Sequence, residues 1–186
     1  MRYNRDMMKE TIFNEGKKQN IVDILASKDR RVEMQRELFQ GYSEQVIVNV
    51  NMNIPGPIKN NRYLRQIFDV GMQDLEKSFQ KHGLMYRLEI HWDLDSGEEN
   101  FYLLSGTMKE VKLATVAFEE ESFFGRLFDA DVLANRQPAI SRKDLGLPAR
   151  KCFICDRPAK ECARSRKHSV EEMQAYITAL YNRKFS

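Results

Sequence analysis

Leu84-Met-Tyr-Arg-Leu-Glu-Ile-His-Trp92 is the clearest strand signal in the chain, because apolar and polar residues alternate along it. Alternation with a period of two predicts a β-strand that buries one face. A turn at Asp95-Ser96-Gly97 then leads into a second apolar run over 101–104. We therefore predict a β-hairpin here, and a hairpin requires a sheet with antiparallel pairs.

Helical spacing of apolar residues and the choice of capping residues predict further elements on both sides of this hairpin. Ser27 and Ser169 are expected as N-caps, the second in a capping box with Glu172. The elements are a helix over 27–42, a strand over 45–54, helices over 60–83 and 107–118, a strand over 123–133 and a helix over 169–181. This order predicts an α+β fold: a two-layer, ferredoxin-like mixed or antiparallel sheet with helices on one face.

A chain of 186 residues with 42% hydrophobic and 31% charged residues is long enough for one core and is not of a disordered or low-complexity class. We expect an N-terminal tail over 1–19 and an α+β catalytic core over 20–135. A basic, Cys- and His-containing segment with the terminal helix, 136–186, is expected to pack on the same domain.

Apolar runs in the chain are only a few residues long, which argues against a helical membrane span. Residues 1–18 lack the apolar centre of a signal peptide, and the three cysteines are an odd number. We therefore expect a cytoplasmic protein without a membrane partner.

Charge is distributed unevenly, with net values of +4 over 1–88, −8 over 89–131 and +7 over 132–186. An acidic middle and a basic end indicate carboxylates that hold a divalent cation and cations that hold phosphates or an acidic partner. Solvated faces that neutralise each other are the alternative.

The acidic part ends in Gly125-Arg-Leu-Phe-Asp-Ala-Asp-Val132. Residues two apart on a strand share a face, so Asp129 and Asp131 would present adjacent carboxylates. Mg²⁺ commonly binds such carboxylates together with substrate phosphates, and Arg126 would clamp a phosphate. A solvated strand edge is the simpler explanation. The run 119–121 of three glutamates would add a third ligand or form the exposed end of a helix.

Three cysteines and a histidine gather near the C-terminus, as Cys152-Phe-Ile-Cys155, Cys162 and His168. Their number and type match a structural Cys₃His zinc site. Buried free thiols are the alternative, whereas a redox pair lacks the expected strand and helix around it. As a zinc ligand, His168 would not serve as a general base.

Basic residues outnumber acidic ones by nine to three over 142–167. This segment suits phosphates or an acidic protein. Apart from Phe153 it lacks aromatic residues for stacking on bases, so we expect no nucleic-acid partner. The loop Asn53-Ile-Pro-Gly-Pro-Ile-Lys59 would bring Lys59 to an anion, or it is only a rigid turn.

Taken together, these motifs resemble the apo-citrate lyase phosphoribosyl-dephospho-CoA transferases, the holo-acyl-carrier-protein synthases of citrate lyase. The resemblance covers about residues 20–182. It is carried by the 53–59 loop, the 125–132 element, Ser141-Arg142, the run 150–155 and the run 162–168. Gly125-Arg126 stands where polymerase-β-like transferases have Gly-Ser, which favours the ferredoxin-like topology.

The resemblance implies a nucleotidyltransferase-type enzyme. Members transfer the phosphoribosyl-dephospho-CoA group from triphosphoribosyl-dephospho-CoA to a serine of the lyase's acyl carrier subunit, releasing pyrophosphate. Asp129, Asp131 and Arg126 are then expected to be catalytic, with Mg²⁺ on the two aspartates. The expected substrate-binding residues are Gly125, Lys59, Arg142 and Arg150.

Two alternatives without catalysis are a zinc-stapled basic module that binds nucleic acid and a scaffold for an acidic protein. Neither would require the two aspartates for chemistry. The general base stays open in the sequence, between one of the aspartates and His168.

Overall fold

The computed structural model describes residues 11–185, which contain four β-strands and five α-helices. In chain order these are α1 (Ile21–Gly41), β1 (Val46–Met52), α2 (Arg62–Lys81), β2 (Tyr86–Leu94), β3 (Gly97–Leu104), α3 (Met108–Glu121), β4 (Phe128–Leu133), α4 (Ala159–Ser165) and α5 (Val170–Phe185). Two short 3₁₀ helices, η1 (Gly125–Leu127) and η2 (Lys143–Leu145), lie between them. Among these described residues, no helix is both long and apolar enough to cross a bilayer.

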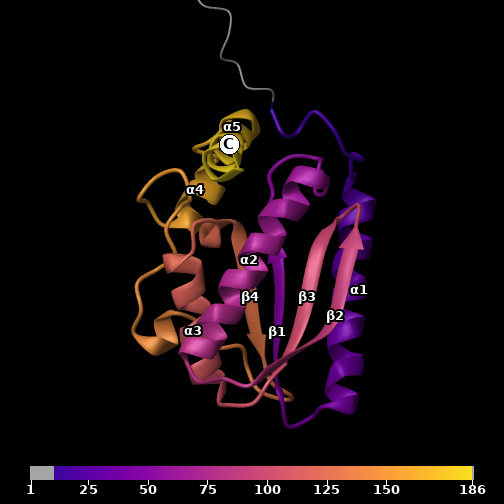
Figure 1. The fold of residues 1–186 in the computed structure, drawn as a ribbon, viewed down its shortest axis with the longest axis vertical. Helices are drawn as coiled ribbons and strands as arrows, with labels where there is room; N and C mark the ends of the chain where they lie inside the picture. Colours follow the sequence, from indigo (N-terminus) through magenta and orange to yellow (C-terminus); the bar gives the residue numbers. More distant parts are fainter. Residues whose placement is uncertain (1–10, 186) are drawn as a thin grey trace, which may run out of the picture.

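All four strands form one antiparallel sheet in the order β2-β3-β1-β4 (Figure 1). The predicted hairpin is confirmed as β2 and β3, with Leu94 opposite Gly97 and Tyr86 opposite Leu104. Helices α2 and α3 cover one face of the sheet and enclose the main hydrophobic core. The predicted α+β class is therefore confirmed, and the sheet is wholly antiparallel rather than mixed.

Helix α2 shows how the sequence forms an element and then packs it. The Asn61 side chain accepts hydrogen bonds from the backbone N–H groups of Tyr63 and Leu64, which caps the N-terminus of the helix. Gly71 lies in the middle of this helix, where a Cβ atom would stand 2.1 Å from the Phe128 ring of β4. The missing side chain lets helix and sheet approach closely.

Helix α1 corrects the prediction of helices on one face only. It packs on the opposite face of the sheet, where Leu38 joins Ile47, Phe101 and Leu103 in a second core. Strands β1 and β3 carry apolar side chains on both faces, so each face must be covered. The arrangement is therefore a sheet between two helical layers, at least along the part that α1 covers.

Two element boundaries also differ from the predictions. Helix α1 begins six residues before the predicted cap Ser27, because Asn20 caps it in a reciprocal capping box with Asp23. The predicted strand over 123–133 is shortened, because η1 precedes β4. Gly125 in η1 is packed so tightly that a Cβ atom would lie 2.4 Å from the Phe118 carbonyl oxygen.

The ends of the described chain meet on the main core. Within the predicted tail, residues 1–10 lie outside the described residues, whereas Ile12 and Phe13 are buried. At the other end, Ser169 and Glu172 form the predicted capping box of α5. Helix α5 places Ile177 in the core, and the Thr178 hydroxyl accepts from the Ile12 N–H at 3.4 Å.

Candidate functional site

The two aspartates of the predicted motif lie on β4, the edge strand of the sheet. Asp129 pairs with Asn51 of β1 and Asp131 pairs with Asn49. Residues directly opposite one another in an antiparallel pair point to the same face, so two carboxylates and two amides form a polar patch on the face that α1 covers. We call this set, together with Glu99 of β3, the carboxylate patch.

Helix α1 supplies the counter-charge to one end of the carboxylate patch. Arg31 donates from Nε and Nη2 to the two Glu99 carboxylate oxygens at 2.8 and 2.6 Å. Glu99 is buried and also accepts from Asn49 at 3.3 Å, while Gln35 donates to Asn49 at 3.2 Å. A buried carboxylate of this kind is retained only when it is paired and hydrogen-bonded.

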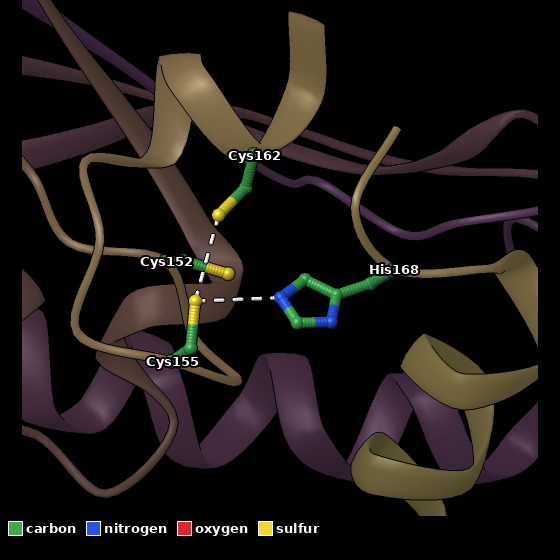
Figure 2. Close-up of side chains that lie close together, drawn as sticks. All are labelled: Cys152, Cys155, Cys162 and His168. Atoms are coloured by element: carbon green, nitrogen blue, oxygen red, sulfur yellow. Dashed lines mark hydrogen bonds between the residues drawn. The ribbon is translucent and has the colours of Figure 1, made fainter. Parts of the chain in front are cut away.

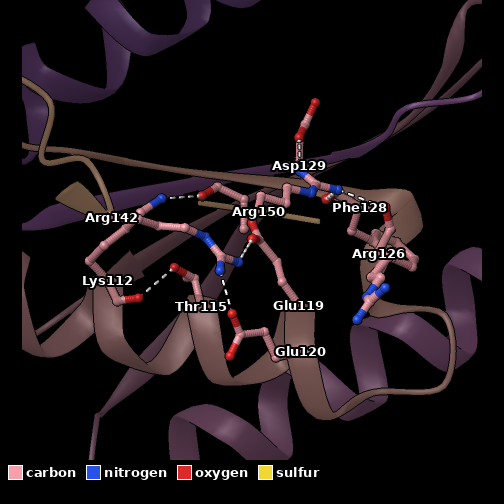
Figure 3. A network of polar contacts seen from close by, with 10 residues as sticks. Lys112, Thr115, Glu119, Glu120, Arg126, Phe128, Asp129, Arg142 and Arg150 are labelled. Carbon is pink, nitrogen blue, oxygen red and sulfur yellow. Dashed lines mark hydrogen bonds and ion pairs between the residues drawn. The ribbon is translucent and has the colours of Figure 1, made fainter. Parts of the chain in front are cut away.

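The other end of the carboxylate patch is held by Arg150. Its Nη1 forms an ion pair with Asp129, and its Nη2 donates to the carbonyl oxygens of Arg126 and Phe128 at 2.7 and 2.6 Å (Figure 3). One guanidinium therefore joins the chain after the sheet to the edge of β4. This fork geometry places several N–H donors in one plane, which a lysine would not do.

Asp131 titrates differently from an ordinary aspartate. The surrounding protein removes part of its hydration, and the Asp129 carboxylate adds like-charge repulsion, so the pKa of Asp131 is raised. The charges of Lys112, Arg31 and Arg150 oppose that rise. A cation next to both carboxylates would relieve the repulsion between the two aspartates.

A pocket of about 270 Å³ lies beside β4, near Arg150. Its charged lining residues are Glu119, Glu120, Arg126, Arg142, Arg150 and Lys151. The four cations exceed the two carboxylates, so the pocket is positive and suited to a phosphate-rich group. The predicted residues Arg126, Arg142 and Arg150 thus meet at one place in the fold.

Within this pocket the arginines differ in what they already bind. Arg142 donates to Glu119 at 2.6 Å and also pairs with Glu120, both near the end of α3 (Figure 3). These two glutamates therefore bind an arginine rather than extending the aspartate pair. Arg126 donates to the neutral Cys152 carbonyl oxygen at 3.3 Å, a contact that leaves its positive charge uncompensated.

Gly125 and Lys59, the two remaining residues predicted to bind substrate, lie outside this pocket. Gly125 is buried against the last turn of α3, so packing already explains a glycine there. Lys59 donates to the Ile54 carbonyl oxygen in the loop after β1, and burial lowers its pKa. Neither residue is among those that line the 270 Å³ pocket.

Three cysteines and a histidine converge in the segment after the sheet (Figure 2). The four potential ligand atoms of Cys152, Cys155, Cys162 and His168 lie within 4.8 Å of one another. Cys155 Sγ is 3.5 Å from Cys162 Sγ and 3.4 Å from His168 Nε2. In the described residues, this is the only group of three or more potential metal ligands brought together in this way.

The thiols of this cluster have unlike surroundings. The hydrogen bond with His168 lowers the pKa of Cys155 to about 6, whereas burial raises the pKa of Cys162 to about 11. Because its imidazole contacts a thiol, His168 belongs to this cluster rather than to the carboxylate patch.

Sequence motifs did not point to Glu99, Asn49 or Arg31. The asparagines of β1 form the polar side of an alternating strand. Such a pattern by itself predicts that this side faces solvent rather than a covering helix. A carboxylate beside apolar residues on a central strand is the signal that would have singled out Glu99. Arg31 lies in a helical segment with several charged residues, where an arginine is usually solvated, so a substrate-side role for it has only weak support in the sequence.

These features define the class: an α+β protein with carboxylates and arginines at the edge strand of an antiparallel sheet, next to a Cys₃His cluster. The chain belongs to the apo-citrate lyase phosphoribosyl-dephospho-CoA transferase family, whose profile matches residues 19–184. The family resemblance of the sequence is thereby confirmed.

Individual proteins named as members of this family are similar in sequence to most of this chain. A Streptococcus pyogenes protein, named a probable apo-citrate lyase phosphoribosyl-dephospho-CoA transferase, is 38% identical over 97% of this chain and 94% of its own. Proteins of Citrobacter koseri and Escherichia coli named as this transferase are 32% and 31% identical, with 87% and 88% of both chains covered.

Proposed function

We propose that this protein is a cytoplasmic transferase that attaches the phosphoribosyl-dephospho-CoA group to a serine of the apo acyl carrier subunit of citrate lyase. The donor would be triphosphoribosyl-dephospho-CoA, and pyrophosphate would leave. The observation that carries the proposal is the family match over residues 19–184. It favours this activity over a zinc-stapled module that only binds nucleic acid or an acidic protein.

The finer description of the fold is part of the same proposal. The elements β1, α2, β2, β3, α3 and β4 follow one another as in a ferredoxin-like domain. The strand order β2-β3-β1-β4 supports this assignment, because it places the first and third strands of the unit at the centre. Helix α1 would then be an addition on the open face.

The carboxylate patch has the donors that a Mg²⁺ ion prefers. Carboxylates of Asp129 and Asp131 share a face with the amide oxygens of Asn49 and Asn51, and all are hard oxygen ligands. Burial first and then the neighbouring Asp129 carboxylate raise the pKa of Asp131, and a cation between the two carboxylates would offset their repulsion. Bound Mg²⁺ would supply charge neutralisation at the phosphates during transfer.

The arginines would act on the phosphate chain of the donor. In the transfer, the serine oxygen bonds to the α-phosphorus while the bond from that phosphorus to pyrophosphate breaks. Arg126 donates to the neutral Cys152 carbonyl oxygen, a contact that leaves its positive charge uncompensated. Arg126 would therefore bind the departing pyrophosphate. Arg142 and Arg150 would complete the positive pocket. Lys59 would contact the triphosphate of the donor from the loop after β1.

Intact-mass analysis of the carrier tests this function directly. The full chain is incubated with apo carrier, triphosphoribosyl-dephospho-CoA and Mg²⁺, and the carrier is expected to gain the mass of one phosphoribosyl-dephospho-CoA group. Asp129→Asn and Asp131→Asn should lower kcat by on the order of 10²- to 10³-fold, because each removes a charge that faces the reacting phosphates. EDTA should abolish the gain in mass.

Glu33→Gln is the matched control, because Glu33 pairs only with Arg36 on the solvent side of α1 in this structure. It should retain the wild-type rate. An unmodified carrier with the wild-type protein, in an assay where a known transferase works, would refute the proposed activity. Near-normal turnover in either aspartate variant would refute the assigned metal site alone.

A further inference from the structure

We propose that Cys152, Cys155, Cys162 and His168 bind one structural Zn²⁺, and that this ion holds the turn over 150–159, with Arg150 at its base, against the edge strand β4. The proposal does not depend on the transferase activity. It rests on the positions of the four ligand groups, on the backbone that carries them and on the contacts that Arg150 makes.

The spacing of the ligand atoms fits a tetrahedral zinc centre. With Zn–S and Zn–N bonds of about 2.3 and 2.05 Å, tetrahedral geometry separates two sulfurs by about 3.8 Å and a sulfur from a nitrogen by about 3.6 Å. Cys155 and Cys162 are 3.5 Å apart, and His168 is 3.4 Å from Cys155. These two pairs are only about 0.3 and 0.2 Å closer than in the bound geometry, and all four ligand atoms lie within 4.8 Å of one another, so small shifts of the side chains would complete the site.

A closed backbone turn presents the first two cysteines. The Cys152 N–H donates to the Arg157 carbonyl oxygen at 2.8 Å, and the Ala159 N–H donates to that of Arg150 at 2.9 Å. An isolated antiparallel bridge between Lys151 and Pro158 closes the same turn. Cys152 therefore lies in the base of the turn, and Cys155 projects from its outer part, as in a zinc knuckle.

The other two ligands follow from helix α4 and its end. Cys162 lies one turn into α4, and Lys167 donates from its N–H to the Cys162 carbonyl oxygen at 3.1 Å. Arg166 ends the helix in the left-handed region, with φ of 46°. This conformation is strained for a non-glycine residue, and it turns the chain so that His168 faces the cysteines.

Packing alone does not account for this cluster. Cys152 and Cys162 are 7% and 6% exposed, which free thiols in a small core would also be. A disulfide between Cys155 and Cys162 would use two sulfurs and leave the third thiol and the imidazole unexplained. A zinc ion uses all four groups, and its positive charge compensates the thiolates.

The cluster is joined to the carboxylate patch by short covalent and hydrogen-bonded paths. Arg150 lies two residues before Cys152 and reaches Asp129 and the carbonyl oxygens of Arg126 in η1 and Phe128 in β4. Arg126 donates to the Cys152 carbonyl oxygen. An ion that fixes the turn therefore also fixes the place from which Arg150 extends.

Metal analysis of the full chain, purified without added zinc, tests the site. We expect about one equivalent of zinc, and less than about 0.1 equivalent in Cys155→Ser and in Cys162→Ser. His82→Ala, which changes a histidine outside the cluster, should retain zinc. Replacing zinc by Co²⁺ should produce the intense visible absorption of a tetrahedral thiolate centre, which does not depend on the variants folding.

Hydrogen exchange then tests the structural role. Removal of zinc by a chelator should accelerate exchange of the Cys152 and Ala159 amides at least tenfold, while amides in β1 and β3 stay protected. Wild-type protein with less than about 0.1 equivalent of metal, or a Cys155–Cys162 disulfide that lowers the mass by two hydrogens, would overturn the zinc site. Unchanged exchange after complete removal of zinc would overturn the link to Arg150.

Discussion

At the scale of single residues, two neighbouring buried glutamates of β3 differ in whether their carboxylates have a charged partner. Glu99 faces α1 and is paired with Arg31. Glu98 is equally buried, at 4% exposed, and its Oε2 has no hydrogen-bond partner among the described residues. Burial, followed by the charges of Asp93 and Asp69, raises the pKa of Glu98 to about 8, although Arg65 opposes the rise.

Glu98→Gln is expected to stabilise the protein increasingly as the pH rises. The folded-state pKa of Glu98 lies above its unfolded value, so between pH 5 and 7.5 the unfolded chain binds fewer protons and wild-type stability falls. Glutamine does not titrate, and the difference in unfolding free energy should grow by up to about 3 kcal/mol across this range. Urea denaturation at several pH values measures it.

His91 lies beside this carboxyl as well, with its Nε2 3.8 Å from Glu98 Oε1. Glu33→Gln should change stability by less than about 0.5 kcal/mol throughout. Parallel pH curves for wild type and Glu98→Gln would contradict the prediction.

At the scale of elements, local capping rules explain most helix starts, including the one that apolar periodicity misplaced. Asn61, Thr107 and Ser169 cap their helices through hydrogen bonds that span two or three residues, and such pairs are visible in a sequence. The start of α1 was misplaced because its first two turns carry exposed apolar residues, Ile21 and Val22 among them, that lack a helical period. Here the cap Asn20 decides the boundary.

Gly71→Ala is expected to destabilise the protein by about 1 to 3 kcal/mol. A Cβ atom at this position would lie 2.1 Å from the Phe128 ring, so α2 and β4 must separate to admit it. Gly41→Ala is the matched control in α1, where a Cβ would meet nothing within 4 Å, and it should be neutral or stabilising. The midpoint of urea unfolding measures both, and equal midpoints would refute the close contact.

At the scale of the whole molecule, the C-terminal helix is part of the main core. Ile177 of α5 is fully buried, Tyr181 stacks edge-on against Tyr63 of α2 at 5.2 Å, and Gln174 donates to the Pro55 carbonyl oxygen. These contacts connect positions more than a hundred residues apart in the chain. They predict that the described part of the chain unfolds as one cooperative unit.

Ile177→Ala is expected to lower the free energy of unfolding by about 2 to 5 kcal/mol, since it leaves a cavity in the core. The single tryptophan, Trp92, lies on β2 against α1 and reports on the opposite side of the sheet. Its fluorescence transition should shift together with the helical circular dichroism signal. Two separated transitions would mean that α5 unfolds independently of the sheet.

Five features could be predicted from the order of amino acids alone: the hairpin, the α+β class, the shared face of Asp129 and Asp131, the ligand types of the Cys and His cluster, and the family resemblance. Each depends on periodicity, on composition or on motifs of a few neighbouring residues, which the order of amino acids states directly. Two residues on one strand share a face whatever the strand pairs with.

Tertiary structure alone decided how these parts meet. The pairing of Glu99 with Arg31, the cover of α1 over the asparagines and the three acceptors of Arg150 depend on strand register and helix docking. Such contacts join residues 14 to 68 positions apart in the chain. The burial of both sheet faces selects among them, and burial belongs to the whole fold rather than to any segment.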